Sequence, residues 1–243
     1  MFSTNFEAST LLDLVRQQDL GSAWLHPIGY AIRNALTQGV PIDNIVLLLL
    51  LPLVAAVIAA SRHLIGLRGF GIFLPAALSA VFVATGPVVG IGLFLVIVSV
   101  STFSRMLLRR LRVKLQYLPR MALILLVVVL AVLAILFVGP QFFGRRELAE
   151  VSIFPVLILV LLAEDFTRAQ LGKSIRIAAS LTVETLILAL FSFVFLSLSA
   201  LQEFALLNPE IYLLIVLGLD LFLGTYSGLR LLEIWRFRKL IRN

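Results

Sequence analysis

Two acidic residues lie inside long apolar stretches of this 243-residue chain, and they are its clearest candidates for chemistry. Glu184 interrupts the stretch 177–201, and Asp220 interrupts the stretch 211–229. An ionisable group inside a membrane segment is costly and therefore indicates a function. Counted along helices from their basic ends, Glu184 lies about 10 Å deep and Asp220 about 13 Å deep. The two carboxylates would suit a proton or cation site, used by a proton-coupled transporter or an export-channel subunit.

A structural role for each acid is the second interpretation, and it is the one we favour. Each carboxylate would then accept hydrogen bonds from hydroxyl groups on nearby helices, or pair with an arginine. The candidate hydroxyl partners are Thr182, Thr185 and Tyr226.

Other patterns that carry catalysis are missing. The chain has no cysteine, and its two histidines, His26 and His63, are far apart in the sequence. It contains no phosphate-binding loop, no nucleophile elbow and no zinc-protease motif. We therefore expect a non-enzymatic protein that needs no cofactor and no metal.

Composition points to a membrane. The chain is 61% hydrophobic and 14% charged, whereas soluble domains are about half apolar and roughly a quarter charged. Its apolar residues form uncharged blocks, and about 20 helical residues cross a bilayer core about 30 Å thick. These blocks predict an all-α integral membrane protein, a bundle of seven transmembrane helices. The predicted segments are Asn44–Ser61, Gly69–Thr85, Pro87–Ser104, Met121–Gly139, Val151–Ala163, Ile177–Leu201 and Ile211–Leu229.

Segments two and three leave one alternative open. They are separated only by Gly86-Pro87, and the second begins in the glycine-rich sequence 66–71. A re-entrant hairpin would give the same charge pattern with five full crossings. We favour two full crossings, because irregular backbone at membrane depth is tolerated only against protein or a wet cavity.

Basic residues orient the segments. Lys and Arg concentrate in every second connection and after segment seven, so these sides are cytoplasmic by the positive-inside rule. The net charge of +7 is explained by topology, and no nucleic-acid partner is expected. The chain would be a multi-pass protein of the bacterial inner membrane, with its N-terminus outside and its C-terminus in the cytoplasm. The most basic cytoplasmic loop holds Arg105, Arg109, Arg110, Arg112, Lys114 and Arg120.

The regions outside the bundle are short. Residues 1–42 are predicted to be an extracytoplasmic amphipathic segment, in which Pro27 opens a helix and Gly39 follows its end. Residues 43–230 form the bundle, and residues 231–243 a basic cytoplasmic tail.

Helix seven carries small residues at a spacing that lets helices approach closely. These helix-packing residues are Gly218, Gly224 and Gly228. We favour packing within the bundle over packing against a partner helix.

Several short motifs stand in an order and spacing typical of one family. They are Gln38-Gly39-Val40-Pro41, Leu51-Pro52-Leu53-Val54-Ala55, Arg62-His63-Leu64-Ile65-Gly66, Phe70-Gly71-Ile72-Phe73-Leu74-Pro75, Leu118-Pro119-Arg120, Phe154-Pro155, Pro209-Glu210 and Leu223-Gly224-Thr225-Tyr226-Ser227-Gly228-Leu229-Arg230. On these residues the chain resembles, over roughly residues 38–237, the bacterial seven-transmembrane domain usually fused to an inactive transglutaminase-like domain.

The resemblance implies partners rather than a reaction. In that family an extracytoplasmic transglutaminase-like domain precedes the bundle, and relatives are associated with ATP-grasp peptide ligases in the cytoplasm. Residues 1–42 are too few for a transglutaminase domain, so we expect either a stand-alone subunit or a partner domain on another polypeptide. The expected function is a non-enzymatic inner-membrane subunit or scaffold of a cell-envelope system, and the family implies no catalytic residue in the bundle.

Overall fold

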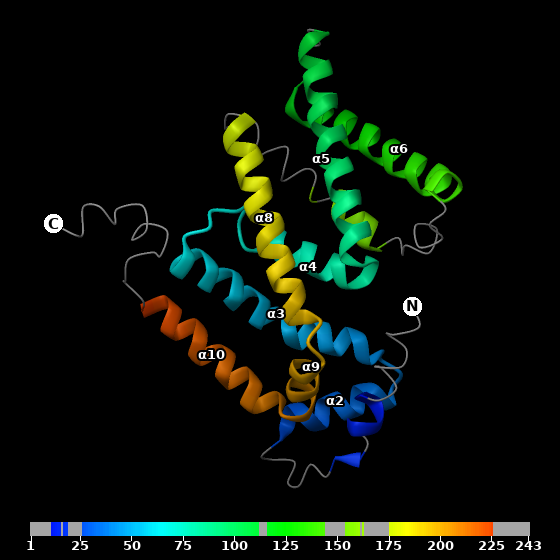
Figure 1. Cartoon of the computed structure of the whole chain (residues 1–243). Coiled ribbons are helices and arrows are strands. Elements are labelled where there is room, and N and C mark those ends of the chain that lie inside the picture. Colours follow the sequence, from blue (N-terminus) through cyan, green and yellow to red (C-terminus); the bar gives the residue numbers. More distant parts are fainter. Residues whose placement is uncertain are drawn as a thin grey trace, which may run out of the picture. The chain divides into compact units, whose positions relative to one another are not determined.

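The prediction of an all-α protein is confirmed by the computed structural model, which describes residues 11–15, 17–18, 26–111, 116–143, 154–160, 162 and 175–225 (Figure 1). Over these residues no strand occurs, and helix is also present at 11–15 and 154–160. The named helices are α2 (Pro27–Thr37), α3 (Ile42–Ala60), a π-helical turn η1 (Ser61–Ile65), α4 (Phe73–Thr85), α5 (Pro87–Arg110), α6 (Tyr117–Phe143), α8 (Ile175–Leu196), α9 (Ser199–Leu207) and α10 (Pro209–Thr225).

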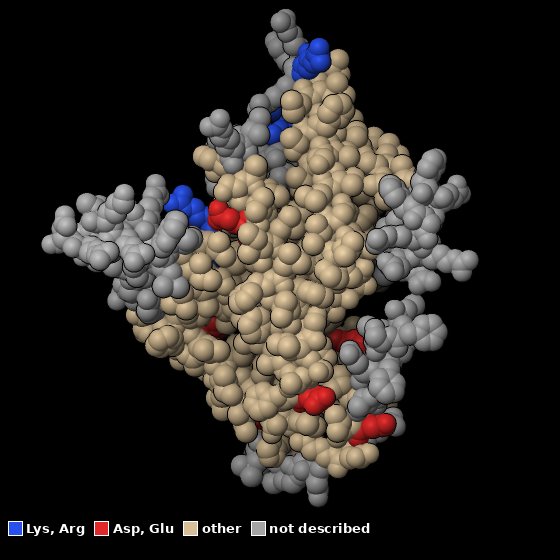
Figure 2. Space-filling view, in the orientation of Figure 1, with Lys and Arg blue, Asp and Glu red and all other residues tan. Residues whose placement is uncertain are grey.

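Four helices of the described chain are long and apolar enough to cross a membrane. They cover Ile42–Ile65, Pro87–Leu108, Tyr117–Phe137 and Ala179–Leu196. A fifth span results if α9 and α10, which meet at an angle of 111°, are counted together. The visible surface of the described residues is almost entirely uncharged (Figure 2), as lipid-facing helices require.

The chain divides into two compact units, of which unit 1 comprises residues 1–67 and 191–243. In this unit α3 contacts α9 and α10, and α10 also contacts α2 and α9. One face of α3 is fully buried at Leu50, Val54 and Ile58, which recur every four residues as a helix face requires. The paired helices α3 and α10 both begin beside α2 and α9 and run in the same direction (Figure 1).

Unit 2 comprises residues 68–190. Here α5 packs against α4 and α6. The α4–α5 turn is made at Gly86, whose φ of +79° is a conformation that glycine adopts without strain. Gly90 then lets the two helices approach, because a Cβ atom there would lie 2.5 Å from the Phe82 ring. Phe82 is fully buried as a result.

Several predicted segment ends are wrong. α5 continues from the predicted end at Ser104 to Arg110, and α6 begins at Tyr117 instead of Met121. At the C-terminal end of α5, arginine side chains let the helix extend beyond its apolar block, because they reach toward water and favour a helix C-terminus. α6 also continues through Gly139-Pro140 to Phe143.

The sixth segment is broken where a continuous helix to Leu201 was predicted. α8 ends at Leu196, and α9 begins at Ser199. The Gln202 side-chain amide donates a 2.7 Å hydrogen bond to the carbonyl of Leu196. This bond satisfies one of the carbonyl groups that a helix leaves unpaired at its C-terminus, and so stabilises the break.

The lengths of α4 and α5 bear on the question of a re-entrant hairpin. α4 has 13 residues, about 20 Å of helix, whereas α5 has 24, about 36 Å and enough to cross alone. Two full crossings require the irregular sequence before α4 to complete the second one. We therefore expect the two ends of α5 to lie on opposite faces of the membrane.

Single cysteines test this, because the chain has no native cysteine. Val88→Cys and Leu111→Cys place thiols near opposite ends of α5, where both native side chains are exposed. An impermeant maleimide should label the two variants from opposite faces in oriented vesicles. Labelling of both from one face would instead establish the re-entrant hairpin.

Candidate functional site

Glu184 on α8 lies in unit 2, where its carboxylate accepts hydrogen bonds from two groups. The backbone N–H of Arg68 donates to Oε2 at 2.5 Å, and the Ser180 hydroxyl donates to Oε1 at 3.0 Å. Glu184 lies about 8 Å along the helix from Ala179, where the candidate span of α8 begins. One carboxylate oxygen thus joins residue 68 to α8, and the other is bound within α8 itself.

The next residue, Thr185, binds the same irregular segment. Its hydroxyl accepts a 2.8 Å hydrogen bond from the backbone N–H of Phe70 and donates one of 2.7 Å to the carbonyl of Leu181. Gly69, between the two bound residues, is buried, and a Cβ atom there would lie 2.9 Å from the Leu188 side chain. A larger residue at position 69 would require the Leu188 side chain to shift. We call Glu184, Thr185 and the backbone of residues 68–70 the α8 clamp.

The chain before residues 68–70 leaves α3 through a turn that ends at a glycine. α3 passes into the π-helical turn η1, and Gly66 ends the turn with φ +98° and a 3.1 Å bond from its N–H to the Ser61 carbonyl. Gly71 adopts φ +43°. π-Helical turns occur frequently at functional sites, and here the turn leads directly into the α8 clamp.

The predicted pairing of Glu184 with Asp220 stays a prediction. Glu184 belongs to unit 2 and Asp220 to unit 1, where it is exposed on α10. Of the predicted hydroxyl partners, Tyr226 lies outside the described residues, and the group that donates to Glu184 is Ser180. In the part of the chain that the structure describes, no three His, Cys, Asp or Glu residues form a group able to hold a metal ion.

A second polar assembly joins the N-terminal region to the start of α10 in unit 1. The Glu210 carboxylate accepts hydrogen bonds from the backbone N–H groups of Ile28 and Gly29, at 2.9 and 3.0 Å. His26 Nδ1 lies 3.6 Å from the other carboxylate oxygen. Because Pro27 has no N–H, these are the first donors that α2 offers. A carboxylate there is also favoured by the positive end of the helix dipole.

Two further side chains complete this assembly. Arg33 of α2 donates to the carbonyl of Val15 at 2.9 Å and to the carbonyl of Gln18. The Gln18 amide in turn donates a 2.7 Å bond to the carbonyl of Leu207, the last residue of α9. We call residues 11–18, α2, α9 and the first turn of α10 the α2 platform. Its helix ends cap one another across long sequence separations.

The helix-packing role of Gly218, Gly224 and Gly228 stays a prediction. A Cβ atom on Gly218 or Gly224 would meet no atom of the described residues within 4 Å. Gly228 lies outside the described residues. In unit 2, the glycines that other side chains approach closely are Gly69 and Gly90.

The predicted basic loop is mostly helical. Arg105, Arg109 and Arg110 lie on the last two turns of α5, and Arg120 lies in the first turn of α6. Arg105 is buried, with 7% of its surface exposed. Arg112 and Lys114 lie outside the described residues, as does the tail 231–243.

Sequence reasoning missed Glu210 and the backbone of residues 68–70 as functional elements. The first contact joins residues 182 and 181 positions apart, so sequence spacing does not reveal it. The role of residues 68–70 depends on which turn of α8 their backbone contacts, and the sequence does not specify that contact.

Comparison with known proteins gives one match. A family model described as seven transmembrane helices usually fused to an inactive transglutaminase matches residues 37–241. No curated protein and no solved structure matches the chain.

The Glu210 contacts predict a stability effect. Glu210→Ala removes both N-terminal bonds of α2, so the free energy of unfolding should fall by about 1 to 2 kcal/mol, as for the loss of a helix cap. Glu210→Gln keeps an acceptor oxygen and should lose less. Equilibrium unfolding in mixed micelles measures both.

Glu203→Ala is the matched control, because Glu203 lies in the middle of α9 and not at a helix end. Equal destabilisation by Glu203→Ala and Glu210→Ala would show that the Glu210 contacts do not hold α2.

Proposed function

The chain belongs to the family of seven-transmembrane domains usually fused to an inactive transglutaminase, and from that membership we propose that it is a non-enzymatic membrane scaffold. Its partner would be an extracytoplasmic transglutaminase-like domain, docked on the α2 platform. The family description supports this kind of partner, and the exposed side of α2 supports docking at the platform.

The observation that carries this proposal is the capping of α2 by Glu210. A helix held at its N-terminus and tied to α9 through Gln18 offers a fixed surface to a partner. The side of α2 that faces away from unit 1 is exposed at Tyr30, Asn34 and Thr37, three or four residues apart. Rigid aromatic side chains flanked by polar ones are typical of protein interfaces.

The proposed orientation puts the α2 platform outside the cytoplasm. The arginines at the end of α5 would then be cytoplasmic, as the positive-inside rule requires. The common direction of α3 and α10 supports an odd number of crossings from the first segment to the seventh (Figure 1). In this orientation the chain sits in the bacterial inner membrane with its N-terminus outside and its C-terminus inside.

A cytoplasmic ATP-grasp ligase is the second proposed partner, and it would bind at the basic C-terminal end of α5. We do not propose transport as a second function, because both carboxylate oxygens of Glu184 accept hydrogen bonds from the protein itself.

Site-specific photo-cross-linking in the native host tests the scaffold. A benzophenone amino acid at Asn34 should cross-link to a transglutaminase-like protein, which mass spectrometry of the purified adduct identifies. The control is Leu214, which is exposed on the apolar surface of α10 and should give no such adduct.

Loss of the adduct in Glu210→Ala, with normal protein levels, would tie the partner to the platform. Docking at α2 would be contradicted if Asn34 and Leu214 both formed adducts with the same protein. It would also be contradicted if Asn34 formed no adduct.

A further inference from the structure

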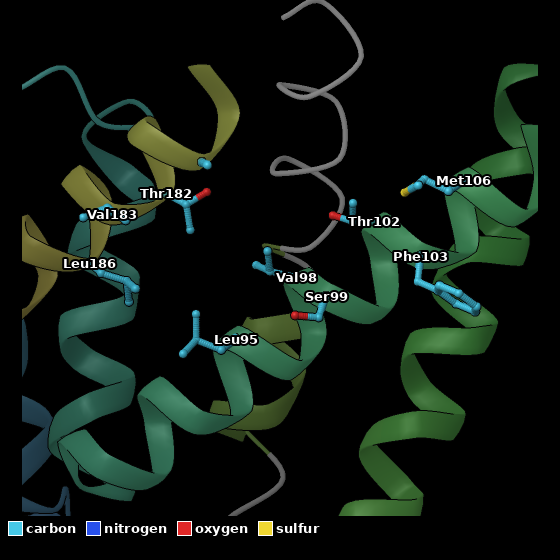
Figure 3. A pocket seen from close by; sticks show the side chains of 10 residues that line it. Leu95, Val98, Ser99, Thr102, Phe103, Met106, Thr182, Val183 and Leu186 are labelled. Atoms are coloured by element: carbon cyan, nitrogen blue, oxygen red, sulfur yellow. The ribbon is translucent and has the colours of Figure 1, made fainter. Parts of the chain in front are cut away.

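Glu210 and His26 place two titratable side chains at the junction of α2 with α10, within unit 1. One carboxylate oxygen of Glu210 accepts hydrogen bonds from the backbone N–H groups of Ile28 and Gly29, and the other lies 3.6 Å from His26 Nδ1. The groove between α5 and α8 in unit 2 differs, because none of the ten residues that line it is charged (Figure 3). A change of pH can therefore act on the junction through its own side chains, and it finds no such group in the groove.

The contacts of Glu210 depend on the charge of its carboxylate. Hydrogen bonds to an ionised acceptor are roughly twice as strong as those between neutral groups. The attraction between His26 and Glu210 also requires that charge, and the positive end of the α2 dipole favours it. Protonation of Glu210 thus weakens several interactions at the N-terminus of α2 together.

The surroundings of Glu210 let solvent protons reach it. Its side chain is 17% exposed, and it precedes the predicted segment Ile211–Leu229. The other charged or titratable side chains on the elements at this junction are Arg33 and Tyr30 of α2, Glu203 of α9, Asp43 of α3, Asp13, and Tyr212 and Asp220 of α10. Within the described residues, none of these has a hydrogen bond or ion pair with the Glu210 carboxylate, which His26 faces.

We propose that the contact of Glu210 with the N-terminus of α2 is an acid-sensitive latch, closed while the carboxylate is ionised and loosened when it takes up a proton. Loosening frees the first turn of α2, whose buried side includes Gly29 and Ile32. The latch is a property of this chain alone and does not depend on the proposed partner.

The direction of the pH effect follows from the pKa of Glu210. Burial acts to raise this pKa, but hydrogen bonds from the backbone N–H groups of Gly29, Glu210 itself and Ile28, together with His26, lower it below its usual value of 4.5. The closed latch therefore favours the ionised form. Its stabilising effect is fully present above pH 4.5, and it is lost as the pH falls through the lowered pKa.

Amide hydrogen exchange of the full chain in lipid nanodiscs, followed from about pH 6.5 down to about pH 3, tests the latch. Dividing each rate by that of an unstructured peptide at the same pH gives the opening equilibrium. Opening at Ile28 and Gly29 should increase about fivefold in acid, the equivalent of about 1 kcal/mol lost from a charged hydrogen bond. The amide of Val54, in the buried face of α3, should show no comparable change and reports on global unfolding.

Three variants separate the latch from a general effect of acid. Glu210→Gln cannot titrate, so the opening of the two amides should become independent of pH. His26→Gln removes a group that lowers the pKa of Glu210, so loosening should begin at a higher pH. Glu203→Gln is the matched control, because Glu203 has no contact with α2, and it should keep the pH dependence of the wild type.

The pH series on the wild type needs no variant to fold. Opening at Ile28 and Gly29 that does not change with pH would overturn the proposal, as would an equal change at Val54. The same pH dependence in Glu210→Gln as in the wild type would also overturn it.

Discussion

Backbone N–H groups that leave a helix inside a membrane must be satisfied by the protein, because lipid offers no acceptor. The constraint applies between α3 and α4, where a π-helical turn and a glycine-rich segment separate two apolar helices. The backbone N–H groups of Arg68 and Phe70 donate hydrogen bonds to the side chains of Glu184 and Thr185, which are adjacent residues of α8. An acidic residue inside a membrane segment is thereby explained by the backbone that it satisfies.

The same principle governs the other end of unit 1, where helix termini are capped by groups from distant parts of the sequence. Glu210 satisfies the first donors of α2, Gln18 the last carbonyl of α9, and Gln202 the last carbonyl of α8. Such bonds each contribute about 1 kcal/mol, and their larger effect is geometric. They fix the angle at which short helices meet long ones. The scaffold proposal depends on that rigidity, because a partner can dock only on a surface that keeps its shape.

Composition and charge were sufficient to predict the class of the protein, and local chemistry predicted several elements. Pro27 and Gly39 bound α2, and Gly86-Pro87 separates α4 from α5. Apolar blocks did not predict the helix ends. α5 continues beyond its apolar block through Arg105, Arg109 and Arg110. α8 ends before Ser197-Leu198, although these residues lie inside an uncharged block. The glycines with close neighbours in the described residues are Gly69 and Gly90, which Leu188 and Phe82 approach. Sequence spacing carries no information about such neighbours.

Amide hydrogen exchange at Arg68 and Phe70, measured in lipid nanodiscs, tests the clamp most directly. Both amides should be protected in the wild type. Glu184→Ala should speed exchange at Arg68 about fivefold, the equivalent of one hydrogen bond of about 1 kcal/mol, and Thr185→Val should do the same at Phe70. Asp220→Ala should leave both amides unchanged. Rapid exchange of both amides in the wild type, or no change at Arg68 in Glu184→Ala, would contradict the claim that α8 satisfies the broken backbone.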